Sequence, residues 1–253
     1  MLSARRGLIA LALLVMSLSC AASAPRLSLP PQVYVALVND SSSEGFVWAN
    51  SFCSGVLVAP RLVVTASHCV NEGNLPDVYV GERDLCHPGG AGERVQVSRM
   101  VVGSGVSKEL AALVLASTAT YVPLEVLPAG ASPGRSVATG WGRLDAVTRR
   151  PCLGKAVLLR EVPSSACRGT IESARTMGAA PSSYACMVPE AGGLNTCVGD
   201  SGGGVYDMSG ALPRVAGVTL GGGGCGATDV GVYASPDAVR AMLELSGMIG
   251  PGQ

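Results

Sequence analysis

The sequence predicts an all-β protein with a substantial hydrophobic core. Hydrophobic residues make up 48% of its 253 residues and charged residues only 14%, which excludes global disorder. Its 34 glycines and 16 prolines favour frequent turns. Short runs rich in valine and leucine recur between these turns, and this spacing is typical of a β-sandwich or β-barrel rather than of βαβ units.

The expected strands are short and mostly bounded by Gly, Pro, Asn or Asp. They cover residues 33–38, 55–58, 62–65, 78–80, 95–102, 110–115, 137–140, 156–159, 214–220 and 231–234. A helical pattern of apolar residues follows Ser235 and runs as far as Met248. Ser235 can cap a helix, Pro236 suits its first turn and Asp237 complements its dipole. We therefore expect a C-terminal helix with one face packed on the β-structure.

Residues 1–24 are expected to form a secretory signal peptide, followed by one domain over residues 25–253. Two arginines precede an apolar run over residues 8–18, and small residues follow it. Cleavage after Ala24 would leave Pro25 at the cut, so cleavage after Ala21 or Ala22 is the alternative. Cys20 allows a second interpretation, a bacterial lipoprotein signal, although residues 17–19 fit that signal poorly. The mature protein is expected to be secreted or extracytoplasmic, with membrane attachment only if Cys20 is lipidated.

The charge balance and the cysteines narrow the class of partner. Lys and Arg total 18, as do Asp and Glu, and no long basic run occurs, so neither a nucleic-acid partner nor binding to a membrane surface is expected. Eight cysteines follow the signal segment, an even number that predicts a disulfide framework in an exported chain. No CxxC pair occurs, which disfavours a zinc site. We expect a monomer without a metal.

Two short motifs contain residues suited to nucleophilic catalysis. Residues 63–69 read VVTASHC and residues 196–203 read TCVGDSGG. A serine hydroxyl is a weak nucleophile until a base removes its proton, and a histidine can be that base. The chain has two histidines. His68 lies in the first motif, whereas His87 lies in a Gly-rich stretch that we expect to be a surface loop.

These motifs, together with the GWG triplet at residues 140–142 and segments 217–221 and 231–233, resemble the trypsin-like serine protease family. The resemblance covers essentially the whole chain after the signal peptide. It implies two six-stranded antiparallel β-barrels packed together, with a C-terminal helix. It also implies that Ser201 is the nucleophile and His68 the general base, with the N–H groups of Gly199 and Ser201 forming the oxyanion hole. No cofactor is expected, and the partner is a protein or peptide substrate.

The chain departs from the family at the third member of the catalytic triad. The family has an aspartate just before an Ala- and Leu-rich strand, and this sequence has Glu109 there. Glutamate has the same charge as aspartate and one more methylene, so it could still orient His68. The alternative is that Glu109 is a solvent-facing residue beside Lys108.

A second departure concerns Asp200. In the family, cleavage before an Ile-Val-Gly-Gly-like sequence frees an amino group that pairs with this aspartate and shapes the oxyanion hole. Residues 25–33 contain no such sequence. Three alternatives remain: another group pairs with Asp200, the pocket is disordered, or the enzyme is inactive.

The resemblance also implies three disulfides and the outline of a specificity pocket. The pairs are Cys53–Cys69, Cys167–Cys186 and Cys197–Cys225, and Cys86–Cys152 follows by elimination.

The position that would need a carboxylate for cleavage after Lys or Arg holds Asn195, with Thr196 beside it. The other expected substrate-binding residues are Thr219, Leu220, which replaces the family's usual Trp, and the two glycines that keep the pocket open, Gly221 and Gly231. We therefore expect a roomy, neutral pocket without Lys or Arg specificity.

Three functional hypotheses follow. The leading one is a secreted serine endopeptidase that cuts peptide bonds through an acyl-enzyme intermediate, with His68, Glu109 and Ser201 as its triad. The alternative is a catalytically impaired homologue that acts as a binding or inhibitory module. A structural or adhesive secreted domain would explain the disulfides but leave both motifs unexplained. Labelling by a serine-reactive fluorophosphonate distinguishes the first hypothesis from the other two.

Overall fold

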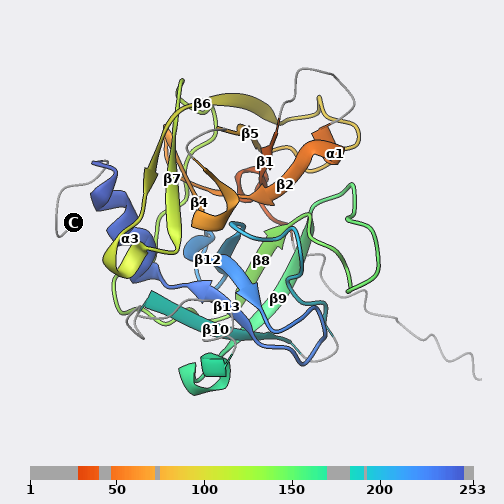
Figure 1. The fold of residues 1–253 in the computed structure, drawn as a ribbon, viewed down its shortest axis with the longest axis vertical. Coiled ribbons are helices and arrows are strands. Elements are labelled where there is room, and N and C mark those ends of the chain that lie inside the picture. Colours follow the sequence, from red (N-terminus) through yellow and green to blue (C-terminus); the bar gives the residue numbers. More distant parts are fainter. Residues whose placement is uncertain (1–27, 40–46, 72–74, 170–182, 191–192, 248–253) are drawn as a thin grey trace, which may run out of the picture.

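The structure is a computed structural model that describes residues 28–39, 47–71, 75–169, 183–190 and 193–247. The expected signal peptide, residues 1–24, and Cys20 lie outside the described residues. The chain forms two antiparallel β-units that lie one above the other in Figure 1, with one helix at their side. Among the described residues, no helix has the length and apolar character needed to cross a bilayer.

The first unit is a seven-stranded sheet in the order β2-β1-β5-β6-β7-β4-β3. Its two edge strands, β2 and β3, are separated in sequence only by Gly55. One bent segment therefore provides both edges and curls the sheet into a barrel. A β-carbon at Gly55 would lie 2.5 Å from Val63 Cγ1, which explains the glycine at the bend. The strands are β1 (Val35–Val38), β2 (Ser51–Ser54), β3 (Val56–Ala59), β4 (Leu62–Ala66), β5 (Asp77–Val80), β6 (Glu93–Val102) and β7 (Leu110–Leu115).

The second unit is a closed barrel of six strands in the order β10-β13-β12-β11-β8-β9. Its strands are β8 (Ser136–Gly140), β9 (Lys155–Val162), β10 (Tyr184–Pro189), β11 (Gly204–Asp207), β12 (Arg214–Gly222) and β13 (Gly231–Ala234). If the bent β2–β3 segment is counted once, each unit has six strands. The predicted architecture of two packed barrels is confirmed.

One apolar cluster joins the two units. It includes Val64 and Leu110 from the first sheet, Tyr206 and Val218 from the second barrel, and Met242 from the C-terminal helix. Each of these side chains is fully buried. Because this cluster extends across both barrels, the two barrels share one hydrophobic core, and this core fixes their relative position.

The C-terminal helix α3 (Pro236–Leu245) begins where the sequence predicts. The Ser235 hydroxyl accepts a hydrogen bond from the Ala238 N–H at 3.3 Å, and Pro236 occupies the first turn. The helix packs on β7, β12 and the short η3 turn (Gly105–Ser107), as Figure 1 shows. Met248, which the predicted pattern includes, lies outside the described residues.

The strand predictions were incomplete in the second barrel and at the edge of the first. Strands β2, β10 and β11 were not expected, and Val33, the first residue of the expected strand 33–38, belongs instead to the 3₁₀ turn η1 (Pro31–Val33). Strand β10 is buried throughout, so it lacks the alternation of a half-exposed strand. Strand β11 begins with Gly204, directly after the Gly-rich motif around Ser201, and this glycine obscures its start in the sequence. A one-turn helix, α1 (Val47–Asn50), precedes β2.

Four disulfides are present, in the pairs expected from the sequence: Cys53–Cys69, Cys86–Cys152, Cys167–Cys186 and Cys197–Cys225. Cys86–Cys152 connects the segment after β5 with the segment before β9, and so joins the two barrels. Beside it the Leu85 N–H donates to the Cys152 carbonyl at 3.1 Å.

We expect the double variant Cys86→Ser/Cys152→Ser to lose about 2–4 kcal/mol of unfolding free energy, since a loop closed over 66 residues no longer restricts the unfolded chain. Urea unfolding followed by tryptophan fluorescence measures this loss. An unchanged midpoint and slope would show that the joint between the barrels is held by packing alone.

Candidate active site

His68 and Ser201 line the same cavity, which has a volume of about 390 Å³. His68 lies in the 3₁₀ turn η2 (Ser67–Cys69) at the end of β4, whereas Ser201 lies in the turn before β11. The first residue therefore comes from the first barrel and the second from the second barrel. The Ser54 N–H donates to the Ser201 carbonyl at 2.8 Å, a bond that fixes one barrel against the other at this point.

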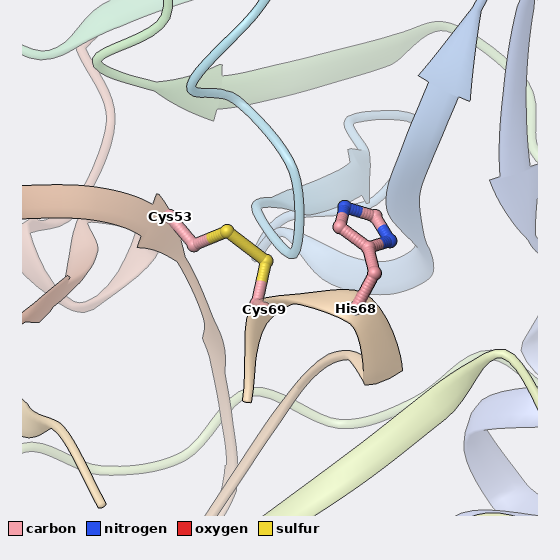
Figure 2. A group of neighbouring side chains, drawn as sticks. All are labelled: Cys53, His68 and Cys69. Atoms are coloured by element: carbon pink, nitrogen blue, oxygen red, sulfur yellow. A yellow bond between two sulfur atoms is a disulfide. The ribbon is translucent and has the colours of Figure 1, made fainter. Parts of the chain in front are cut away.

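Local bonds hold the turn that carries His68. The Cys53–Cys69 disulfide ties η2 to β2, and the Ser67 N–H donates to the Glu109 carbonyl at 2.8 Å. Figure 2 shows the imidazole of His68 standing on this turn beside the disulfide. The histidine thus sits on a braced turn rather than on a mobile loop.

Glu109 lies in the turn directly before β7, next to the His68 turn, and its carboxylate is half-buried. Burial lowers the pKa of His68 below its ordinary value of 6.5, whereas the negative charge of Glu109 raises that pKa and offsets part of the shift. Within the described chain, His68 makes no hydrogen bond to Glu109 or Ser201. Such bonds are often long in unliganded active sites and tighten only when substrate binds.

The turn around Ser201 depends on glycine. Gly199 has φ +100°, in the left-handed region, and its β-carbon would lie 3.0 Å from Arg150 Cδ. Gly202 has φ +79°, and a β-carbon there would lie 2.1 Å from Thr65 Oγ1. Gly202 therefore lets the turn pack tightly on the first barrel, and Gly199 lets it pack on the β8–β9 connection of the second barrel.

The N–H groups of Gly199 and Ser201 have no acceptor among the described residues. Both residues line the cavity. Two unpaired backbone donors beside a serine hydroxyl are the arrangement that stabilises an oxyanion during acyl transfer.

Asp200 has a partner that the sequence did not reveal, Lys155. The two side chains are buried, and Lys155 Nζ lies 2.8 Å from Asp200 Oδ2. Asp200 also accepts hydrogen bonds from the Gly142 N–H at 2.7 Å and the Cys197 N–H at 2.8 Å. Burial raises the pKa of Asp200, and the positive charge of Lys155 opposes that shift. The sequence left three alternatives open for Asp200. The structure shows the first of them, in which a group other than a terminal amine pairs with this aspartate.

The alternation of residues along β9 indicates that the Lys155 side chain is buried. Along β9, Lys155, Val157 and Leu159 are buried while Ala156 and Arg160 between and after them are exposed. A lysine at the buried phase of a strand needs a charged partner, and Asp200 was the acid without one.

Three of the residues expected to bind substrate lie in the wall of this cavity. Thr196, Thr219 and Gly221 line it, together with Gly222, Gly224 and the Cys197–Cys225 disulfide. The Thr196 and Tyr233 hydroxyls are 2.8 Å apart. No carboxylate occurs among the described residues that line the cavity.

Three expected substrate-binding residues do not line the cavity. Asn195 is buried, and its side-chain N–H₂ donates to the Gly226 and Asp229 carbonyls at 3.0 and 2.9 Å. Leu220 is the extra residue of a β-bulge in β12 and packs into the core. Gly231 faces the Tyr233 side chain, since its β-carbon would lie 2.4 Å from the Tyr233 hydroxyl oxygen.

Within the part of the chain that the structure describes, two groups of side chains have the spacing of metal ligands: His68 with Cys53 and Cys69, and Asp84 with Cys86 and Cys152. The cysteines of both groups form disulfides and therefore have no thiolate to offer a metal. His87, the other histidine, is exposed and pairs with Asp84 at 3.2 Å, in keeping with a surface position.

A serine and a histidine that meet where two antiparallel barrels join define the class of double-barrel serine proteases. Comparison with known proteins agrees: the Trypsin family model matches residues 23–242. The chain belongs to the trypsin family.

Individual relatives are distant. Chymotrypsin-like elastase family member 1 from Felis catus is 30% identical over 190 residues, which cover 70% of each chain. The protein of the same name from Macaca fascicularis is 28% identical over 210 residues, covering 78% of this chain and 75% of the relative. Serine protease 56 from Mus musculus is 30% identical over 215 residues, but the match spans only 35% of that longer protein.

Proposed function

We propose that the protein is a secreted serine endopeptidase that hydrolyses peptide bonds through an acyl-enzyme intermediate. The observation that carries this proposal is the convergence of His68 and Ser201 on one cavity, beside the two unpaired N–H groups of Gly199 and Ser201. Four disulfides support an oxidising, extracytoplasmic location for a domain over residues 25–253.

Each residue has a role in the proposed reaction. Ser201 Oγ attacks the carbonyl carbon while His68 accepts its proton, and Glu109 stabilises the imidazolium that forms. The N–H groups of Gly199 and Ser201 bind the developing oxyanion. His68 then donates the proton to the leaving amine, and a water molecule activated by His68 hydrolyses the acyl-enzyme.

The substrate is proposed to carry an uncharged side chain before the scissile bond. The cavity wall offers glycines, Thr196 and a disulfide, and a buried Lys or Arg cation would find no carboxylate there. Gly221 lies at the partly exposed end of β12, after the buried Thr219, and a substrate backbone can add there as a further strand. Two relatives are named as elastases, and a neutral pocket is compatible with such a relationship.

The deciding experiment is fluorophosphonate labelling of the purified protein, with Ser201→Ala as the control. We expect stoichiometric labelling of the wild type and none of the variant, because the reagent reacts with an activated serine. Peptide libraries that vary the residue before the scissile bond should then show cleavage after uncharged residues and little after Lys or Arg.

The competing proposal is a family member that has lost activity and binds other proteins. Glu109 at the acid position and Leu220 in place of Trp favour it. A folded protein with all four disulfides that resists fluorophosphonate labelling would make this second proposal the better one.

A further inference from the structure

We propose that Lys155 takes the place of a freed terminal amino group and holds the active site in its working shape, so that the protease is competent once folded, without activating cleavage. This inference rests on the proposed function. It concerns how the site is assembled and therefore goes beyond naming the reaction.

The ammonium group of Lys155 has a full set of acceptors. It lies 2.8 Å from Asp200 Oδ2, 2.7 Å from the Arg143 carbonyl and 3.3 Å from the Asn195 carbonyl. A lysine ammonium has three N–H donors, and each has an acceptor here. Such complete pairing is the condition under which a charge can be buried.

The space around Asp200 leaves no room for a second ammonium group. A β-carbon at Gly140 would lie 2.4 Å from one carboxylate oxygen of Asp200, and a β-carbon at Gly142 would lie 2.3 Å from the other. The backbone of residues 140–142 therefore wraps closely around the carboxylate. A terminal amino group could pair with Asp200 only by displacing Lys155.

The ion pair binds the segments on both sides of the turn that carries Ser201. Through Asp200 it fixes the N–H groups of Gly142 and Cys197, and through Lys155 it fixes the Asn195 carbonyl at the back of the pocket. Arg143, whose carbonyl binds Lys155, donates its own N–H to the Val198 carbonyl at 3.0 Å, next to Gly199. Loss of the pair would loosen the turn that presents the oxyanion donors.

The strand pairing explains how Lys155 reaches this place. Lys155 is the first residue of β9 and pairs with Gly140, the last residue of β8. Its side chain points to the buried side of the strand and is 7% exposed. The β8–β9 hairpin therefore places the Lys155 side chain beside Asp200. This placement does not depend on the chain before residue 28.

The test measures the rate of fluorophosphonate labelling in the mature chain with a retained amino-terminal tag and after removal of that tag. We expect equal rates, since no terminal amine takes part. Lys155→Met should lower the rate by about 100- to 1000-fold, the cost of losing an oxyanion donor. Arg149→Met, a change of an exposed cation in the same β8–β9 connection, should leave the rate unchanged.

Further variants separate positioning from folding. Lys155→Met leaves Asp200 buried and unpaired, which destabilises the fold, whereas Lys155→Met/Asp200→Asn removes both charges and should restore thermal stability but not labelling. In Lys155→Ala, added propylammonium should recover part of the labelling rate by occupying the vacated space. A purely structural lysine would show no such recovery.

The outcomes distinguish the two proposals. A folded wild type that is not labelled overturns the proposed function and this inference together. A labelled wild type whose Lys155→Met or double variant reacts at the same rate, or whose activity depends on removing the tag, overturns only the role of Lys155.

Discussion

Glu109→Gln is expected to lower kcat by about 10⁴-fold with little change in stability. Glutamine keeps the size of the side chain but removes the charge that stabilises the His68 imidazolium, and loss of the triad acid in a known serine protease has an effect of this size. The backbone carbonyl of residue 109, which holds the Ser67 N–H, is untouched. Steady-state hydrolysis of a peptide ester and amide measures the loss.

Two controls make the Glu109 result specific. Glu125→Gln removes an exposed carboxylate far from the cavity lining and should leave kcat unchanged. Glu109→Asp shortens the side chain to the residue usual in the family, and it should keep more activity than Glu109→Gln. Equal rates for the wild type and Glu109→Gln would mean that Glu109 is a surface residue and that His68 is oriented without an acid.

The pH profile gives a second result with a defined sign. Because the protein environment lowers the pKa of His68, the histidine stays neutral and able to accept a proton below pH 6.5. The acid limb of the kcat/KM profile should therefore fall below pH 6.5 in the wild type. Glu109 raises the pKa of His68, so Glu109→Gln should move that limb to still lower pH. A limb that moves upward would contradict the proposed contact.

The local signals in the sequence were enough to predict the fold class and to single out His68 and Ser201, which the structure places at one cavity. Short Val- and Leu-rich runs mark strands because β-branched side chains suit a pleated sheet, and the motifs around His68 and Ser201 encode turns whose shape depends on adjacent residues. The helix cap at Ser235 is also a local device and was predicted correctly. Three strands were missed: β10 lacks alternation, β11 begins with a glycine, and β2 is a four-residue strand that contains two serines.

The sequence alone could not predict the direction in which individual side chains point in the folded protein. Counting back from Ser201 places Asn195 at the base of the pocket, but its amide turns to the carbonyls of residues 226 and 229, which come from a distant loop. The Lys155–Asp200 pair joins residues far apart in the chain through the β8–β9 hairpin and the turn before β11. Both arrangements follow from tertiary contacts. The alternation along β9 marks Lys155 as buried, but it does not identify Asp200 as its partner.

Gly221→Val is expected to change the substrate preference of the proposed enzyme without unfolding it. Gly221 lines the cavity beside Ser201, and a β-carbon there would meet no atom within 4 Å. By contrast, β-carbons at Gly224 and Gly231 would lie 2.2 and 2.4 Å from other side chains, so substitutions there would disturb the wall itself. Position 221 is therefore suited to narrowing the pocket.

The valine should exclude large side chains from the pocket while admitting small ones. We expect kcat/KM for a peptide with phenylalanine before the scissile bond to fall by about 100-fold relative to the matching alanine peptide, since even one methylene changes discrimination by about 10- to 200-fold. Gly210→Val, which adds the same side chain at an exposed turn between β11 and β12, is the matched control. If both peptides lost activity equally in Gly221→Val, position 221 would contact the substrate backbone rather than the side chain, and the specificity pocket would lie deeper, toward Thr196.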